Sequence, residues 1–188
     1  MAPTALVPIA NGSEDIESVT IIDVLRRAGV DVTVASVHDE HTVTAARQTR
    51  ITADTLIGEC ANTTYDLIAL PGGMPGAEHL GNSASLQAQL HAQRAAGRWY
   101  AAICAAPAVA LEPNGLLEDR AATAHPGFQA RLSDQSRVNE RVVIDGNCIT
   151  SQGPGSALEF ALTLVEVLCG EDKRDEVAAP MVLPESVS

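Results

Sequence analysis

Short apolar runs of strand length recur along the chain and are separated by turns and amphipathic stretches. Four such runs cover residues 4–10, 30–35, 66–70 and 99–103, with weaker candidates at 48–52 and 121–124. Apolar runs this short, bounded by polar or glycine-rich turns, are typical of strands buried on both faces. The pattern therefore predicts a sheet whose strands are spread over much of the chain.

Segments with helical periodicity lie between these strands. After Ser13, a good N-cap residue, apolar side chains recur every three or four positions until Gly29 ends the helix, and acidic residues fill the first turn. Further helices are predicted over residues 83–96 and 157–168. Strands that alternate with helices favour a mostly parallel sheet with helices on both faces.

The last third of the chain departs from this alternation. Residues 141–144 and 148–150 are apolar runs around Asp145-Gly146-Asn147, which is the strongest hairpin signal in the sequence. A glycine-rich turn over residues 151–156 follows. From Glu171 onward the charges are mixed and prolines occur, which predicts a short capping segment and a frayed end.

Length and composition fit one α/β domain over residues 1–188. The chain is 46% hydrophobic but only 3% aromatic, so its core is built from aliphatic side chains, as in buried parallel strands and their covering helices. A chain of 188 residues is long enough to bury such a core without disulfides or metals.

Charge and cysteine usage exclude several classes of function. The formal net charge of −12 opposes binding to nucleic acid or to an anionic membrane surface. The four cysteines lie far apart, and the N-terminus lacks the basic start of a signal peptide, so we expect a cytoplasmic protein with free thiols. The five histidines show no metal-ligand spacing, so no metal site is predicted.

The predicted architecture gathers four segments at one edge of the sheet. In parallel α/β sheets, ligands bind outside the carboxyl ends of the strands, near the point where the strand order reverses. The segments expected there are residues 11–17, the loop 71–76, Cys104 and His125. The fold prediction is what brings them together, because no spacing along the sequence does so.

Cys104 follows directly on the apolar run 99–103 and precedes an Ala-rich stretch with Pro107 in its first turn. This pattern predicts a buried strand, an abrupt turn and a helix, with the cysteine at the turn. A helix start favours thiolate over thiol, and small neighbours let backbone crowd around the sulfur as in a nucleophile elbow. The alternative is an inert small hydrophobic residue, which a cysteine in an apolar run usually is.

The other candidate residues have roles that such a thiol would need. Glu17 can share a hydrogen bond with the sulfur if burial keeps its carboxyl protonated; otherwise it is an ordinary acid at a helix start. His125 is a candidate general acid or base, or simply a loop histidine. Backbone N–H groups of the loop at Gly72 and Gly73, and of Ala105, are candidates for an oxyanion hole.

Taken together, these motifs resemble the ThiJ/PfpI superfamily, and within it the branch of the parkinsonism-associated deglycase and bacterial YajL. The resemblance extends from about Thr4 to Leu183 and is specific because several motifs occur in order. The motifs are residues 5–7, 12–19, 23–30, 70–73 with 76–77, 101–107 and 150–155.

The resemblance implies a flavodoxin-like three-layer α/β sandwich that forms a homodimer and uses neither a metal nor an organic cofactor. It also implies that Cys104 is the nucleophile and oxidation-sensitive thiol, that Glu17 is its hydrogen-bonded acid and that His125 is the nearby histidine. Arg27 and Arg47 match positions of anion-contacting arginines near the dimer interface.

Two functions from different classes are consistent with these residues. One is a glyoxalase or deglycase that acts on methylglyoxal-type 1,2-dicarbonyls or on their early adducts with proteins. The other is a redox-sensing stress chaperone whose Cys104 is oxidised to a sulfinate. A cysteine peptidase or amidase is a weaker alternative, because it needs a well-aligned Cys-His pair.

Overall fold

The structure is a computed structural model that describes residues 2–183. Its centre is a seven-stranded sheet in the order β5-β2-β1-β6-β7-β9-β8, in which only β8 is antiparallel to its neighbour. The strands are β1 (Thr4–Ile9), β2 (Asp31–Ser36), β5 (Thr55–Leu56), β6 (Leu67–Leu70), β7 (Trp99–Ile103), β8 (Val142–Asp145) and β9 (Cys148–Ser151). The strand order reverses between β1 and β6, which is where such sheets place their ligands.

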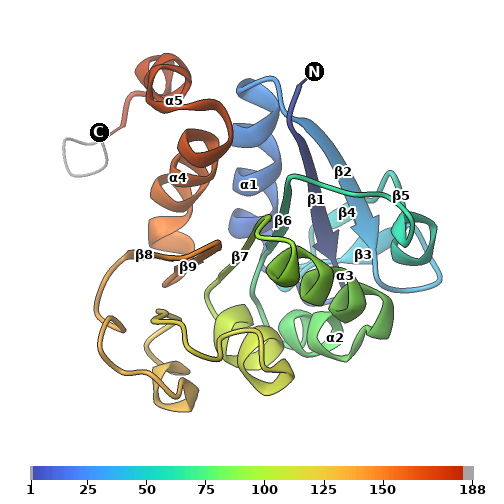
Figure 1. The fold of residues 1–188 in the computed structure, drawn as a ribbon. Coiled ribbons are helices and arrows are strands. Elements are labelled where there is room, and N and C mark those ends of the chain that lie inside the picture. The colour runs from blue at the N-terminus through green and yellow to red at the C-terminus, as the bar shows by residue number, and fades with distance from the viewer. Residues whose placement is uncertain (1, 184–188) are drawn as a thin grey trace.

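Helices cover both faces of this sheet, which makes the fold a flavodoxin-like α/β sandwich (Figure 1). The helices α1 and α4 lie side by side on one face, and α3 covers the other. The α-helices are α1 (Asp15–Arg27), α2 (Gly76–Asn82), α3 (Ala84–Ala95), α4 (Ala157–Cys169) and α5 (Glu171–Ala178). Among residues 2–183 no helix has the length and apolar character needed to cross a bilayer.

Aliphatic side chains fill the core, as the composition predicted. Leu6, Leu70 and Leu90 are among the largest fully buried residues, and Phe160 is the one buried phenylalanine of that set.

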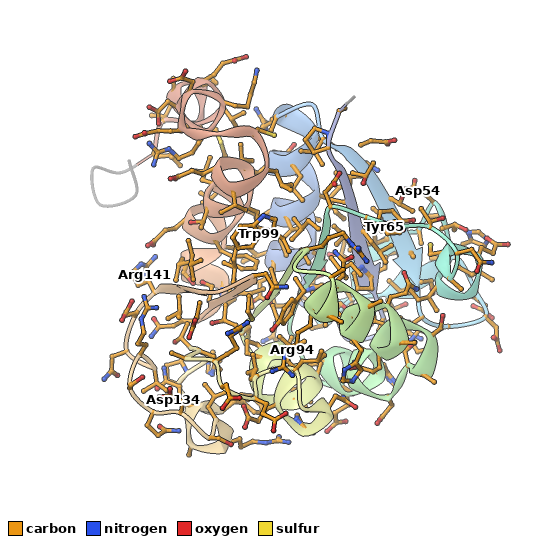
Figure 2. All side chains as sticks on the ribbon, viewed as in Figure 1. Asp54, Tyr65, Arg94, Trp99, Asp134 and Arg141 are labelled. Atoms are coloured by element: carbon orange, nitrogen blue, oxygen red, sulfur yellow. The ribbon has the colours of Figure 1, made fainter. Side chains whose placement is uncertain are left out.

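Outside this core, Arg94 on α3 donates to the carbonyls of Gly115 and Glu118 at 2.7 and 2.6 Å (Figure 2). These bonds hold the segment after β7 against α3.

Most predicted elements are confirmed to within two or three residues, including the hairpin of β8 and β9, which turns at Gly146-Asn147. Two helices were missed: α2, which follows the glycine-rich loop at once, and α5, which lies in the tail expected to be a short capping segment. Residues 184–188, where a frayed end was expected, lie outside the described residues.

The strand candidate at 48–52 is confirmed as the short strand β4 (Arg50–Thr52), which pairs with β3 (Thr42–Thr44) in a separate hairpin. Two local predictions were wrong. Residues 121–124 form no strand, because the N–H groups of Ala121 and Thr123 donate to the side chains of Asp145 and Thr150 instead of a strand ladder. Ser13 is not the N-cap of α1, which begins after Glu14.

Candidate active site at Cys104

Cys104 is the first residue after β7, and its backbone is left-handed, with φ of +66°. This confirms the predicted elbow. Its N–H donates to the carbonyl of Ser151 at 2.9 Å, and its own carbonyl accepts the N–H of His125 at 2.8 Å. A left-handed conformation costs a residue with a side chain roughly 1–2 kcal/mol. The two hydrogen bonds hold the residue there from both sides.

Gly72 allows the loop after β6 to pass directly against this turn. A Cβ atom at Gly72 would lie 2.6 Å from the Cβ of Cys104 and 2.8 Å from the carbonyl oxygen of Ile103, so no side chain fits. The Gly72 N–H donates to Oε2 of Glu17 at 2.8 Å. The loop therefore contacts the cysteine and holds the carboxyl group at the same residue.

Glu17 lies in the first turn of α1 and is fully buried. The N-cap of this helix is Glu14, whose side chain accepts the N–H of Glu17 at 2.8 Å. Ser13, the predicted N-cap, is used elsewhere, because its hydroxyl accepts the N–H of Ala10 at 3.0 Å. The helix start thus fixes the backbone of Glu17 while Gly72 fixes its side chain.

Glu17 and Cys104 lie close enough that each shifts the pKa of the other, and both groups have raised pKa values. Burial raises the pKa of Glu17 to about 7, against the opposing effect of the Gly72 N–H. Burial also raises the pKa of Cys104 to about 12, and the negative charge of Glu17 acts in the same direction. Near neutral pH the pair therefore carries no more than one negative charge.

The predicted activation by a helix start is not supported, because the segment after Cys104 is a turn and then a five-residue π-helix over Pro107–Leu111. A segment this short has little dipole. The N–H groups of Gly73 and Ala105 do favour the charged sulfur. Formation of the thiolate therefore depends on these donors and on Glu17 taking up the thiol proton.

Two of the three predicted oxyanion donors remain available. Gly73 and Ala105 direct their N–H groups toward the sulfur, where the oxygen of a reacting carbonyl would also lie. The N–H of Gly72 is already bonded to Glu17, so its assignment to the oxyanion hole was wrong. Its observed role is to position the acid.

His125 adjoins the site through its backbone. Its exposed ring lies beside Gly153 and Phe128, and its Nδ1 accepts the N–H of Gly127 at 3.1 Å. That bond fixes a tautomer in which Nε2 carries the proton when the ring is neutral. Within residues 2–183 no hydrogen bond joins the ring to the thiol of Cys104, so a role in proton transfer stays a prediction.

Arg27 and Arg47 do not meet Cys104 within one chain. Arg27 lies ten residues beyond Glu17 along α1, a distance of about 15 Å for a helix, and pairs with Asp23 at 2.6 Å. Arg47 is exposed, and its backbone N–H donates to Asp15 at 2.8 Å. Anion contacts by these arginines near a dimer interface stay a prediction.

Sequence reasoning missed three residues that shape the site: Glu14, Ser151 and Ser156. Glu14 caps α1, and the carbonyl of Ser151 holds the N–H of Cys104. Ser156 is bonded to Ser151 through their hydroxyls at 2.7 Å. The only signal was the cluster of serine, glycine and proline at residues 151–156, which is equally typical of an ordinary turn.

Comparison with known proteins agrees with this geometry. Residues 3–167 match the sequence model of the DJ-1/PfpI family. The chain belongs to this family. The solved structure "Toxoplasma gondii DJ-1, oxidized" has a TM-score of 0.94 and 48% sequence identity, and the match covers 96% of this chain and 98% of that one. This likeness confirms the fold predicted from the sequence.

Curated relatives of this DJ-1/PfpI chain carry more than one kind of name. "Protein DJ-1 homolog B" of Arabidopsis thaliana is 48% identical over 91% of this chain, but the match spans only 39% of that protein's length. "Protein dj-1beta" of Drosophila melanogaster is 40% identical over 97% of this chain and 98% of its own. "Glutathione-independent glyoxalase DJR-1.2" of Caenorhabditis elegans is 35% identical, with 91% of each chain covered.

The raised pKa of Glu17 predicts how stability depends on pH. The folded-state pKa of about 7 lies above the ordinary value of 4.5, so the protein loses stability as pH rises through this window. Glu17→Gln removes the ionisation. The difference in free energy of unfolding between this variant and wild type should shift in favour of the variant by roughly 2–3 kcal/mol from pH 5 to pH 8. Urea denaturation measures both free energies.

Glu118→Gln, which neutralises an exposed carboxylate, is the matched control and should follow the wild-type pH dependence. Parallel curves for wild type and Glu17→Gln would show that Glu17 ionises normally.

Proposed function

We propose that this chain is a glutathione-independent glyoxalase in which Cys104 attacks methylglyoxal-type 1,2-dicarbonyls. One observation carries the proposal: a cysteine in a left-handed turn lies beside a fully buried glutamate, and burial raises the pKa of that glutamate to about 7. A carboxyl with this pKa can both accept and return a proton near neutral pH. The name of the Caenorhabditis elegans relative supports the same activity.

The first step is attack of the sulfur on the aldehyde carbon. A C–S bond forms, the carbonyl electron pair moves to oxygen, and the thiol proton passes through Glu17 to that oxygen, which gives a hemithioacetal. The N–H groups of Gly73 and Ala105 stabilise the negative charge that develops on the oxygen. The step needs no added thiol, because Cys104 supplies the sulfur.

The second step moves a proton between the two carbons of the substrate. Glu17 removes the former aldehyde hydrogen as a proton, the electron pair forms an enediol, and the proton returns to the neighbouring carbon. The product is a thioester, and water cleaves its C–S bond to release a 2-hydroxy acid and the free thiol. Oxidation at one carbon balances reduction at the other, so no cofactor is consumed.

Early adducts of dicarbonyls with protein groups present the same carbon, so a deglycase activity uses the same residues. Cys104 is 8% exposed, which favours substrates that reach it through a small reactive group.

A cysteine peptidase is less well supported, because Nδ1 of His125 accepts the N–H of Gly127 and the described residues contain no bond from this ring to the thiol. Glu17 holds the position that a catalytic histidine would need.

A second function, oxidation sensing in stress defence, is favoured by the donors around the sulfur. Two molecules of peroxide convert a thiol to a sulfinic acid and release two molecules of water. The N–H groups of Gly73 and Ala105 would stabilise the added negative charge, and a changed charge would alter what the protein binds. The similar Toxoplasma gondii protein is described as oxidised in its solved structure, which supports the same chemistry here.

We also propose that the chain forms a homodimer whose interface includes α1. Ile16 and Val19 are 56% and 51% exposed there. Val19 lines a groove of about 330 Å³ whose other residues include apolar side chains and both charge signs, among them Asp23 and Arg26. A surface with both signs can complement a second copy of itself about a twofold axis.

The free state of all four cysteines favours a cytoplasmic location.

The glyoxalase proposal predicts that Cys104→Ser abolishes conversion of methylglyoxal to lactate in glutathione-free buffer. Glu17→Gln should lower kcat roughly a hundredfold, because it removes the group that moves protons. Cys169→Ser, which removes the most exposed cysteine, should keep full activity. A wild-type rate equal to that of Cys104→Ser would contradict the proposal.

The oxidation proposal predicts selective modification of Cys104 under mild peroxide. Peptide mass spectrometry should find two added oxygen atoms at Cys104 before Cys169 is modified, although Cys169 is the more exposed of the two. Equal oxidation of both cysteines would show that exposure alone governs the reaction.

The dimer proposal predicts that Val19→Asp yields monomers in light-scattering measurements, because it places charge in the apolar centre of the interface. Ile144→Asp, which changes another exposed isoleucine on the edge strand β8, should leave the dimer intact. A wild-type chain that is monomeric at micromolar concentration would overturn this placement.

A further inference from the structure

Two buried serines lie behind the elbow, and neither belongs to the proton-transfer machinery of Cys104 and Glu17. Ser151 ends β9 and Ser156 precedes α4, and both side chains are almost completely buried. Their hydroxyl oxygens are 2.7 Å apart. A direct bond between two buried hydroxyls is costly to break, because a buried polar group that loses its partner keeps its desolvation penalty.

Further hydrogen bonds tie this pair to the neighbouring backbone. The Ser151 hydroxyl donates to the carbonyl of Arg141, the residue before β8, at 2.7 Å. The Ser156 hydroxyl accepts the N–H of Gly153 at 3.1 Å and lies 3.0 Å from the Gly153 carbonyl, to which it can also donate. These bonds join the start of β8, the end of β9 and the turn before α4.

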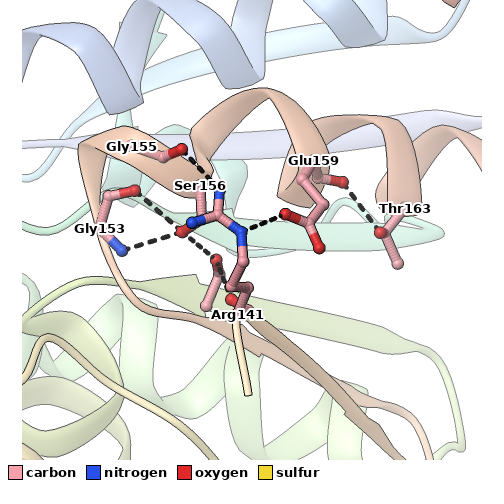
Figure 3. A network of polar contacts seen from close by, with 7 residues as sticks. Arg141, Gly153, Gly155, Ser156, Glu159 and Thr163 are labelled. Atoms are coloured by element: carbon pink, nitrogen blue, oxygen red, sulfur yellow. Dashed lines mark hydrogen bonds and ion pairs between the residues drawn. The ribbon is translucent and has the colours of Figure 1, made fainter. Parts of the chain in front are cut away.

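A set of bonds at the surface fastens the same three segments together. Nε of Arg141 pairs with Glu159 on α4 at 2.7 Å, and its Nη2 donates to the carbonyl of Gly155 at 2.7 Å (Figure 3). Arg141 and Glu159 are partly exposed, so water screens this pair and its contribution to stability is small. The buried hydroxyl pair therefore supplies the stronger constraint on the turn.

The constrained segment touches the candidate site at two places, once at Cys104 and once at His125. The carbonyl of Ser151 accepts the N–H of Cys104 at 2.9 Å, at the residue where the backbone turns left-handed. Two residues later, Gly153 passes the ring of His125, and a Cβ built there would be 3.5 Å from Cδ2 of that ring. Any movement of residues 151–156 would therefore shift the backbone of Cys104 and the wall beside it.

We infer that Ser151 and Ser156 are positioning residues for the nucleophile, whose paired hydroxyls hold the carbonyl that fixes the Cys104 turn. The inference rests on the proposed function only in that Cys104 is taken as the reacting group. Neither serine touches substrate. Their contribution is to keep the sulfur aimed between Glu17 and the N–H groups of Gly73 and Ala105.

A purely structural role would lower stability when a hydroxyl is removed but would leave the reactivity of Cys104 unchanged. A positioning role lowers reactivity as well. Alkylation of Cys104 by iodoacetamide, followed by peptide mass spectrometry across a range of pH, reports on the thiol directly. This measurement does not depend on the identity of the substrate.

Ser156→Ala should slow alkylation of Cys104 at neutral pH roughly tenfold, because a small misplacement of a reacting group has a large effect on rate. The midpoint of the pH dependence should also rise, since the donors would then be less well aimed at the sulfur. Ser156→Thr, which keeps a hydroxyl, should restore most of the rate. Ser151→Ala tests the same bond from the other side if Ser156→Ala does not fold.

Thr163→Ala is the matched control, because Thr163 lies on α4, the helix that follows Ser156, and its hydroxyl donates to the carbonyl of Glu159 at 2.9 Å (Figure 3). In this variant the rate of Cys104 alkylation should lie within about twofold of the wild-type rate. Wild-type alkylation in both serine-to-alanine variants, with only reduced stability, would overturn the inference. If the wild type does not convert methylglyoxal, the glyoxalase proposal is refuted, but the alkylation rates still test the role of the two serines.

Discussion

The close backbone contact between Gly72 and Cys104 is the constraint on which the site depends. Because Gly72 has no side chain, the loop after β6 can lie directly against the turn after β7. The same glycine donates its N–H to Glu17, and the next residue directs its N–H at the sulfur. Nucleophile, acid and hydrogen-bond donors are therefore all placed by the junction of two adjacent parallel strands. Such a junction is rigid, since both strands are buried where they meet it.

The electrostatic arrangement at this junction costs stability, and the proposed chemistry depends on it. A carboxyl group with no exposure to water is disfavoured in its charged form, and a thiol beside it is disfavoured for the same reason. Each can lose its proton only if the other keeps one. A surface glutamate would remain charged at neutral pH and could not return a proton to a substrate. Burial of Glu17 is thus what makes the pair able to exchange a proton in both directions.

The sequence predicted best what is decided locally. The strand before Cys104, the abrupt turn and the hairpin of β8 and β9 follow from apolar runs and turn residues, and each was confirmed. The meeting of Glu17 with Cys104 depends on strand order, which spacing along the chain does not encode. Gly72 was predicted as an oxyanion-hole donor, but its bond to Glu17 could not be seen in the sequence. The family resemblance supplied the pairing of Glu17 with Cys104.

Two features near the site could not be predicted from local patterns, because in each a side chain takes a backbone N–H group that the pattern assigned to another partner. Residues 121–124 have a strand-like composition, yet the hydroxyl of Thr150 and the carboxylate of Asp145 take up their N–H groups. Ser13 has the right residue type for an N-cap, but its hydroxyl bonds back to Ala10, and Glu14 caps the helix instead. In the first case the partners are distant along the chain, and in the second a neighbour three residues away takes the hydroxyl, so the local pattern alone does not select the partner.

The two proposed functions draw on one set of contacts and compete for one sulfur. Donors that stabilise the oxygen of a hemithioacetal would equally stabilise the oxygens of a sulfinate, and an opening that admits a small aldehyde also admits peroxide. A sulfinate has no thiol proton to give to Glu17, and it cannot attack a carbonyl carbon. Each molecule that is oxidised is therefore lost to dicarbonyl turnover. Under these two proposals, the elbow sets how fast Cys104 meets either reagent, and the relative amounts of dicarbonyl and oxidant decide which of the two reactions prevails.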